Sequence, residues 1–209
     1  MSTIVVVKKS GKAVIAADTM SSFGDTKVIS KYLNGRSKIL KCGPSYIGVL
    51  GSAAHNNVLA SIIRKYQRRL SFNSADDIFE TCLKLHPILK GEYFLNVDEG
   101  DNDDYESSQM ESLIANPKGI FAVYSWREVF EYERFWALGS GMEFALGAMH
   151  AAYDLVESPE EIAKMGITAS CEFDNGSGLP FTLHSMKLTK RERRKNGKRV
   201  YKALQLTAR

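Results

Sequence analysis

The sequence contains few of the residues from which disulfide and metal sites are built. Its three cysteines, Cys42, Cys82 and Cys171, are an odd number, lie far apart and form no CxxC pair. Its four histidines form no HExxH motif and no cluster with cysteine. This pattern indicates reduced thiols and argues against a disulfide framework or a zinc site. We therefore expect a cytoplasmic protein that uses no metal and no other cofactor.

Long apolar runs and targeting signals are also missing. No apolar run approaches the ~18 residues that predict a membrane span, and no basic segment with a cleavage site follows Met1. No Walker motif is present, so any energy source would be a separate chain. The 209 residues, 44% hydrophobic and 25% charged, are typical of one globular core. We expect a single domain over residues 1–209 that has no membrane partner.

The net charge of +4 is unevenly distributed along the chain. Acidic residues gather at residues 98–106, in a segment without the sixth-position glycine and the final glutamate of an EF-hand loop. Basic residues gather at residues 187–202, around an Asn196-Gly197 pair that favours a hairpin turn. We expect a solvated acidic loop and a basic C-terminal β-hairpin extension at about residues 187–206.

Strand and helix signals occur in blocks rather than in alternation. Helices are predicted to follow the N-cap residues Ser52, Ser74 and Ser158, and Pro87 is expected to kink or stop the second of them. The residues from 129 to 138 are predicted to form one strand. The order is strands, two helices, strands, two helices, strands, and it contains no βαβ unit. This order favours an α+β fold of two stacked antiparallel sheets with helix pairs on their outer faces, a four-layer αββα sandwich.

Two hydroxyl residues, Ser2 and Thr3, stand directly behind Met1 at the start of the first predicted strand. A serine nucleophile needs a nearby base, and the sequence contains no GxSxG motif. If Met1 is removed, the α-amine of Ser2, with an ordinary pKa of about 7.7–8.0, can be that base. Thr3 does not fit the same role, because alternate side chains of a strand face opposite ways. The sequence therefore predicts Ser2 as nucleophile, activated by the loss of Met1 alone.

Asp18 and Lys38 are the candidates for tuning this amine. Asp18 ends the second strand, which is predicted to pair with the first, and Lys38 begins the next hairpin. A lysine near the amine lowers its pKa, and an aspartate keeps that lysine charged and in place. Taken singly, an aspartate at a strand end is usually a turn residue, and Lys38 is expected to be exposed.

The opening STIVVV and GKAVIAAD segments resemble the proteasome β-subunits and their bacterial relatives, which are N-terminal-nucleophile hydrolases and include the heat-shock locus V peptidase. The catalytic aspartate of this family matches Asp18, sixteen residues after Ser2. Its catalytic lysine matches Lys38 in RSKIL. The family usually carries threonine where this sequence has Ser2, and serine supports the same chemistry.

Further motifs extend the resemblance along the chain. Gly51 in GSAA matches the family's backbone oxyanion donor, and Ser140 in GSG matches its structural and catalytic serine. Asp174 and Ser177 in DNGSG would hold the terminal amine and Ser140. His55 stands where relatives often have an acidic residue, and we expect it to serve packing or to lie on the surface. The resemblance also implies substrate-binding positions at Ser21, Ser22, Val49 and Ala53.

The resemblance implies a peptidase that cleaves peptides or unfolded proteins inside a homo-oligomeric chamber of stacked rings. A separate ATP-dependent unfoldase is a possible partner. Nucleic acid is not expected, because the basic segment offers only Tyr201 for stacking and carries no binding motif. One alternative stays open, since the fold can persist without the chemistry. It is a catalytically inactive ring or scaffold protein that binds nucleic acid or a partner through the basic hairpin.

Overall fold

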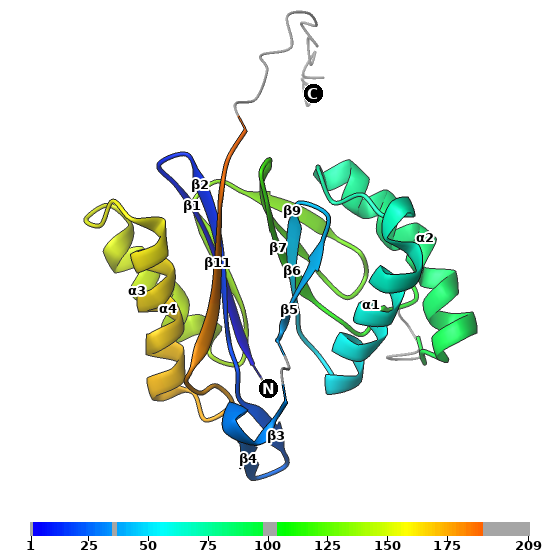
Figure 1. Cartoon of the computed structure of the whole chain (residues 1–209), viewed down its shortest axis with the longest axis horizontal. Coiled ribbons are helices and arrows are strands. Elements are labelled where there is room, and N and C mark those ends of the chain that lie inside the picture. Colours follow the sequence, from blue (N-terminus) through cyan, green and yellow to red (C-terminus); the bar gives the residue numbers. More distant parts are fainter. Residues whose placement is uncertain (1, 35–36, 98–103, 190–209) are drawn as a thin grey trace, which may run out of the picture.

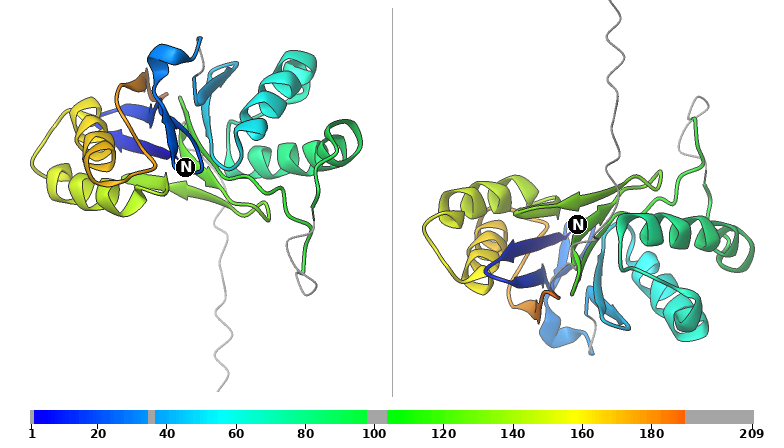
Figure 2. Two further views of the ribbon diagram at one scale, coloured as in Figure 1. Left: turned by 90° about the horizontal axis from the view of Figure 1, so that it is seen from below. Right: turned by 90° about the horizontal axis from the view of Figure 1, so that it is seen from above.

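The computed structural model describes residues 2–34, 37–97 and 104–189 (Figure 1). Two antiparallel sheets of these residues lie face to face, with strand orders β10-β1-β2-β11 and β5-β6-β7-β8-β9. Helices α3 and α4 cover the outer face of the first sheet, and α1 and α2 cover that of the second (Figure 2). The predicted α+β sandwich of four layers is therefore confirmed.

Nine of the described strands form the two large sheets. The strands of the first sheet are β1 (Thr3–Lys9), β2 (Lys12–Asp18), β10 (Phe135–Gly139) and β11 (Phe181–Lys187). Those of the second are β5 (Ile39–Cys42), β6 (Ser45–Val49), β7 (Ser112–Asn116), β8 (Gly119–Val123) and β9 (Val129–Tyr132). A small hairpin of β3 (Ser21–Phe23) and β4 (Thr26–Val28) and a short helix η1 (Ser30–Tyr32) lie between β2 and β5. The other helices are α1 (Ala53–Tyr66), η2 (Gln67–Arg69), α2 (Ala75–Tyr93), α3 (Met142–Tyr153) and α4 (Pro159–Phe173).

The β-branched run of β1 is explained by its position between two apolar layers. Ile4 and Val6 pack into the core between the two sheets, whereas Val5 and Val7 pack against α3 and α4. Because both faces of the strand are covered, every position from residue 4 to residue 7 is fully buried and favours an apolar side chain. Burial on both faces holds β1 firmly, so its first residues are well placed to carry a site.

Local signals account for the helix starts. Ser52, Ser74 and Ser158 each accept a backbone N–H of the first helical turn with their side chains, as predicted. Pro87 does not stop α2, which continues to Tyr93. Pro87 and Leu83, the residue one turn earlier, both lie on the exposed side of the helix. Water can therefore solvate the Leu83 carbonyl that proline leaves without its helical donor.

The strand predicted over residues 129–138 is in fact two strands in different sheets. β9 pairs with β8 in the second sheet, and β10 pairs with β1 in the first. Glu133 and Arg134, both exposed, lie where the chain crosses between the sheets. Alternation of side chains indicates extended backbone but does not reveal which neighbour it pairs with. The β3–β4 hairpin was also absent from the prediction, because its strands are too short to carry a pattern.

The charged segments lie partly outside the described residues. Residues 98–103 of the acidic segment and residues 190–209, which hold most of the basic hairpin, are not described. Glu106, at the end of the acidic segment, forms an ion pair with Lys90 and a hydrogen bond with His86, both of α2 in its own chain. Among the described helices, none has the length and apolar character needed to cross a membrane.

Candidate active site

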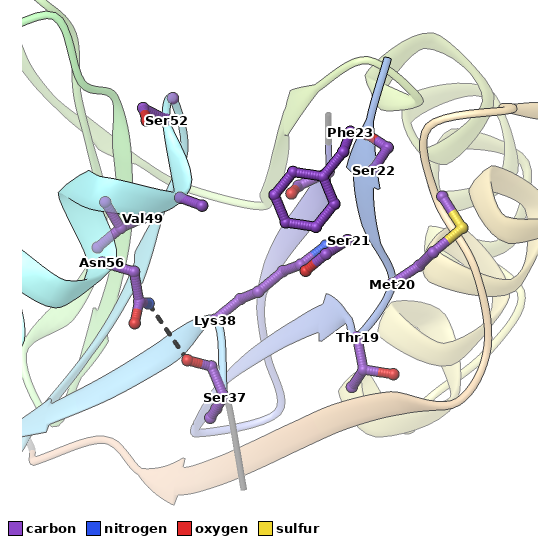
Figure 3. Close-up of a pocket in the computed structure, with 13 residues that line it drawn as sticks. Thr19, Met20, Ser21, Ser22, Phe23, Ser37, Lys38, Val49, Ser52 and Asn56 are labelled. Atoms are coloured by element: carbon purple, nitrogen blue, oxygen red, sulfur yellow. Dashed lines mark hydrogen bonds between the residues drawn. The ribbon is translucent and has the colours of Figure 1, made fainter. Parts of the chain in front are cut away.

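The tip of β1 separates the two N-terminal hydroxyl residues. Ser2 lines a pocket that lies between β3 and the start of α1, as the labelled residues Ser22 and Asn56 show in Figure 3. Thr3 is fully buried and contacts Ser177 and Gly141 instead. The alternation of side chains along a strand thus directs the two hydroxyl groups to different environments. Seven residues predicted from the sequence line this pocket, namely Ser2, Ser21, Ser22, Lys38, Val49, Gly51 and Ala53.

A buried ion pair stands next to Ser2. Lys38 Nζ lies 2.7 Å from Asp18 Oδ1, and the Asp18 side chain is completely buried. The same carboxylate accepts the backbone N–H groups of Thr3, at 3.0 Å, Met20, at 3.1 Å, and Gly178, at 3.2 Å. Four donors therefore satisfy a charge that burial alone would make unfavourable. This arrangement positions Asp18 rigidly between β1, β3 and the loop before β11.

Lys38 is less exposed than the sequence suggested. Its side chain is only 14% exposed and extends across the pocket (Figure 3). Burial lowers the pKa of Lys38 below its ordinary value, against the opposing attraction of Asp18. The prediction of an exposed lysine was wrong, because its Nζ reaches the buried carboxylate of Asp18 and its side chain lines a pocket together with the residues of β3, a strand that the sequence did not reveal.

Behind the tip of β1, three predicted residues form a second polar network. Ser140 Oγ and Ser177 Oγ each donate to Asp174 Oδ2 at 2.7 Å. Burial would raise the pKa of Asp174, but the donors Ser140, Ser177 and the Gly176 amide outweigh it and lower the pKa overall. The backbone N–H of Ser140 donates to the Ser2 carbonyl at 3.0 Å. The network therefore adjoins the N-terminal residues of β1.

The approach of β1 to the turn between β10 and α3 requires glycine. Gly139 has a φ of +105°, and a β-carbon there would lie 1.9 Å from the Ser2 carbonyl oxygen. A β-carbon at Gly141 would lie 2.5 Å from Thr3 Oγ1. Neither position has room for a side chain, which explains the spacing of the glycines around Ser140.

The loop at the opposite side of the pocket presents Gly51, with a φ of +107°. Ser52 follows as the N-cap of α1, and its own N–H donates to His55 Nδ1 at 3.1 Å. His55 is 8% exposed, and burial lowers its pKa. The expectation of a packing or surface role missed the part that His55 plays in capping α1. A capping partner at the third helical position is a known sequence signal. Asn56 was also missed, and its Nδ2 donates to the Ser37 carbonyl at 3.2 Å beside Lys38 (Figure 3).

The arrangement has the parts of a hydroxyl-based acyl-transfer site. A serine at the tip of β1, a lysine of lowered pKa and a glycine just before a helix line one pocket. Groups of these kinds can serve as a nucleophile, as a charge that tunes a nearby base and as a donor to a developing oxyanion. All the predicted catalytic residues lie in the pocket or in the two polar networks that support it.

Similar proteins span nearly the whole chain, although no model of a known protein family matches it. The chain is 29% identical over 185 residues to the ATP-dependent protease subunit HslV of Bartonella quintana and covers 88% of each protein. It is 25% identical over 180 residues to the ATP-dependent protease subunit HslV of Roseobacter denitrificans, covering 84% of this chain and 89% of the relative.

Solved structures extend these comparisons. The structure of Thiobacillus denitrificans BPH is 39% identical, with a TM-score of 0.85 over 90% of this chain and 99% of that one. A second structure, the same protein in complex with epoxomicin, has a TM-score of 0.83 and the same coverage. HslV of Trypanosoma brucei shares the fold, with 16% identity and a TM-score of 0.67 over 88% of this chain and 99% of its own.

Proposed function

The chain belongs to the proteasome β-subunit-like N-terminal-nucleophile hydrolases, and we propose that it is a peptidase whose nucleophile is the hydroxyl of Ser2. One observation carries the proposal. Ser2 lies at the N-terminal tip of β1 in the same pocket as Lys38 and Gly51, beside a lysine held by a fully buried aspartate. An amine and a hydroxyl on one residue supply both base and nucleophile once the peptide bond before Ser2 is cleaved.

The reaction follows from these groups. The neutral α-amine of Ser2 accepts the hydroxyl proton while Oγ attacks the carbonyl carbon of the substrate peptide bond. The negative charge that develops on the carbonyl oxygen is stabilised by the Gly51 N–H. The amine then donates its proton to the leaving nitrogen, and an acyl ester remains on Oγ. Water, deprotonated by the same amine, hydrolyses the ester and regenerates the hydroxyl.

The two polar networks divide the supporting roles. The positive charge of Lys38, kept in place by Asp18, lowers the pKa of the nearby amine, so that more of it is neutral at pH 7. Ser140, Asp174 and Ser177 hold the amine from the other side. Because Asp174 accepts both serine hydroxyl protons, the oxygen of Ser140 is oriented as an acceptor for an amine N–H.

The pocket walls suggest how a peptide binds. Ser21 and Ser22 belong to the short strand β3, whose backbone can pair with an extended substrate. Val49 and Ala53 provide apolar surface on the side of β6 and α1. We propose that these four residues contact the substrate next to the bond that is cleaved.

The assembly is proposed from the relatives. The family membership supports a homo-oligomeric chamber of stacked rings in the cytoplasm, built from one domain per chain. The name of the HslV relatives, ATP-dependent protease subunit, supports a separate ATP-dependent unfoldase as partner. In this assembly, the basic segment at about residues 187–206 would contact a neighbouring subunit, where complementary charge orients the partners.

The test begins with a protein whose first residue is Ser2, prepared by cleaving a ubiquitin fusion directly before it and checked by mass. We expect cleavage of small peptides, inhibition by epoxomicin and retention of activity in Ser2→Thr. Ser2→Ala should assemble like the parent but lose turnover. Turnover that survives in Ser2→Ala would place the nucleophile elsewhere. A ring without any turnover in the Ser2 form would favour the inactive scaffold.

A further inference from the structure

The side-chain hydroxyl of Thr3 is buried and makes hydrogen bonds that the pairing of β1 with its neighbouring strands does not require. Its side chain is fully buried, its Oγ1 accepts the Gly141 N–H at 3.0 Å, and the same oxygen lies 2.7 Å from Ser177 Oγ. Valine has nearly the same shape and would fill the space equally well. Burying a hydroxyl group costs free energy unless hydrogen bonds compensate for the lost contact with water. The hydroxyl of Thr3 therefore has to be explained by the bonds it makes.

The direction of each hydrogen bond in this network can be deduced. A serine hydroxyl has one proton, and the proton of Ser177 is donated to Asp174 Oδ2. The bond between Thr3 and Ser177 must therefore have Thr3 as donor. The chain of donors runs from the Gly141 amide to Thr3, then to Ser177 and then to Asp174. Ser140 donates to the same carboxylate oxygen from the other side.

Residues 2 and 3 together hold the turn that carries Ser140. Two successive amides of this turn donate to them, since the Ser140 N–H bonds the Ser2 carbonyl at 3.0 Å and the Gly141 N–H bonds Thr3 Oγ1. Ser170 Oγ donates to the Gly141 carbonyl at 2.8 Å and ties the turn to α4. Without the Thr3 hydroxyl, Gly141 loses its acceptor and Ser177 loses its donor, so both are driven to new partners.

We propose that Thr3 is a positioning residue, whose buried hydroxyl fixes the hydrogen-bond directions around Asp174 and holds Ser140 at the correct place beside the Ser2 amine. The inference rests on the proposed function, because that amine is the proposed base. It assigns the second hydroxyl of the N-terminal pair a task distinct from nucleophilic attack. The hydroxyl at residue 2 reacts, and the hydroxyl at residue 3 orients the groups that hold the base.

Three variants distinguish a role of the Thr3 hydroxyl in orienting the site from a role in stabilising the fold. Thr3→Val keeps the shape and removes the hydroxyl, whereas Thr3→Ser keeps the hydroxyl. Thr81→Val is the matched control, because Thr81 is also a buried threonine, 2% exposed, with two hydrogen bonds to Ser71. It lies in α2, on the outer side of the other sheet. All proteins are prepared with Ser2 as first residue through the ubiquitin fusion.

Two readouts are needed, one of which does not depend on turnover. The first is kcat and KM for a small peptide. The second is the apparent pKa of the Ser2 amine, obtained from the pH dependence of its acylation by a water-soluble anhydride and read by peptide mass spectrometry. We expect Thr3→Val to lower kcat by roughly 10- to 100-fold with little change in KM, because a small displacement of reacting groups is costly.

Thr3→Val should also change the titration of the Ser2 amine. An acceptor that moves away no longer stabilises the charged amine, so its apparent pKa should fall by roughly half a unit in Thr3→Val. Thr3→Ser should restore both values, and Thr81→Val should change only the unfolding midpoint. An unchanged amine titration with kcat within twofold of the parent would overturn the proposal. If the parent itself shows no turnover, the proposed function fails, and the amine titration still decides the role of Thr3.

Discussion

Replacing Lys38 tests the ion pair on which the site depends. Lys38→Met removes the charge and keeps most of the apolar stem. The Lys38–Asp18 pair is buried, with side-chain exposures of 14% and 0%, so the variant leaves a buried carboxylate without its cation. Breaking such a pair usually costs about 3–5 kcal/mol of stability. Asp18 keeps the amide donors of Thr3, Met20 and Gly178, and we therefore expect the lower end, about 3 kcal/mol.

The measurement is urea unfolding at one fixed protein concentration, because assembly also contributes to apparent stability. The variants are made on a Ser2→Ala background, so that self-cleavage does not interfere. Asp18→Asn and the double variant complete the cycle. We expect the double variant to lose at least about 1 kcal/mol less than the sum of the single losses, as residues in direct contact couple.

Activity is measured separately, with Ser2 in place. We expect Lys38→Met to lower kcat by about 100-fold or more, the usual range for loss of a group that acts on the general base. Unfolding of Lys38→Met within about 0.5 kcal/mol of its parent, the behaviour of a surface position, would refute the reasoning. In that case the lysine would serve the chemistry without contributing to the fold.

Three further predictions concern Gly139, His55 and Glu160. Gly139→Ala should abolish peptide cleavage, because its β-carbon would lie 1.9 Å from the Ser2 carbonyl; an active, correctly folded variant in a peptide assay would contradict this. Burial lowers the pKa of His55 below 6.5, so its contribution to stability is present above pH 6.5 and lost as the pH falls through the lower folded value. His55→Gln keeps a capping acceptor, and its urea midpoint should decline less between pH 7 and pH 5 than that of the parent. Burial raises the pKa of Glu160, but hydrogen bonds from groups including Lys12 and Ser185 outweigh it and hold the pKa at about 2. Glu160→Gln should therefore lower the free energy of unfolding by about 1–2 kcal/mol at pH 7, and this loss should disappear as the pH falls from 4.5 towards 2. Thermal melts of parent and variant at pH 7 and near pH 2 can show both effects.

Much of this molecule follows from local sequence. The N-caps at Ser52, Ser74 and Ser158 were predictable, because capping depends on residues within one helical turn. The different environments of Ser2 and Thr3 were predictable as well, since neighbouring side chains of a strand point in opposite directions. The order of strands and helices was sufficient for the four-layer architecture, because apolar faces of sheets and helices have few ways to cover one another.

Other features depend on partners that are distant in the sequence. The sequence predicted one strand over residues 129–138, but the two halves of this segment pair in different sheets. The alternation of side chains within one segment does not specify which strand it pairs with. The sequence predicted an exposed Lys38, but its side chain is only 14% exposed and pairs with the buried Asp18, beside a hairpin too short to predict.

Residue order alone specifies that Ser2 stands at the tip of β1, where the loss of Met1 would bring a hydroxyl and an amine together on one residue. The surroundings of these groups depend on contacts between distant parts of the chain. Thr3 bonds Gly141 and Ser177, which are 138 and 174 residues away, and no local pattern specifies such contacts. Their geometry arises when the two sheets and α4 pack around β1, because a hydrogen bond is directional and forms only where the fold brings donor and acceptor within about 3 Å.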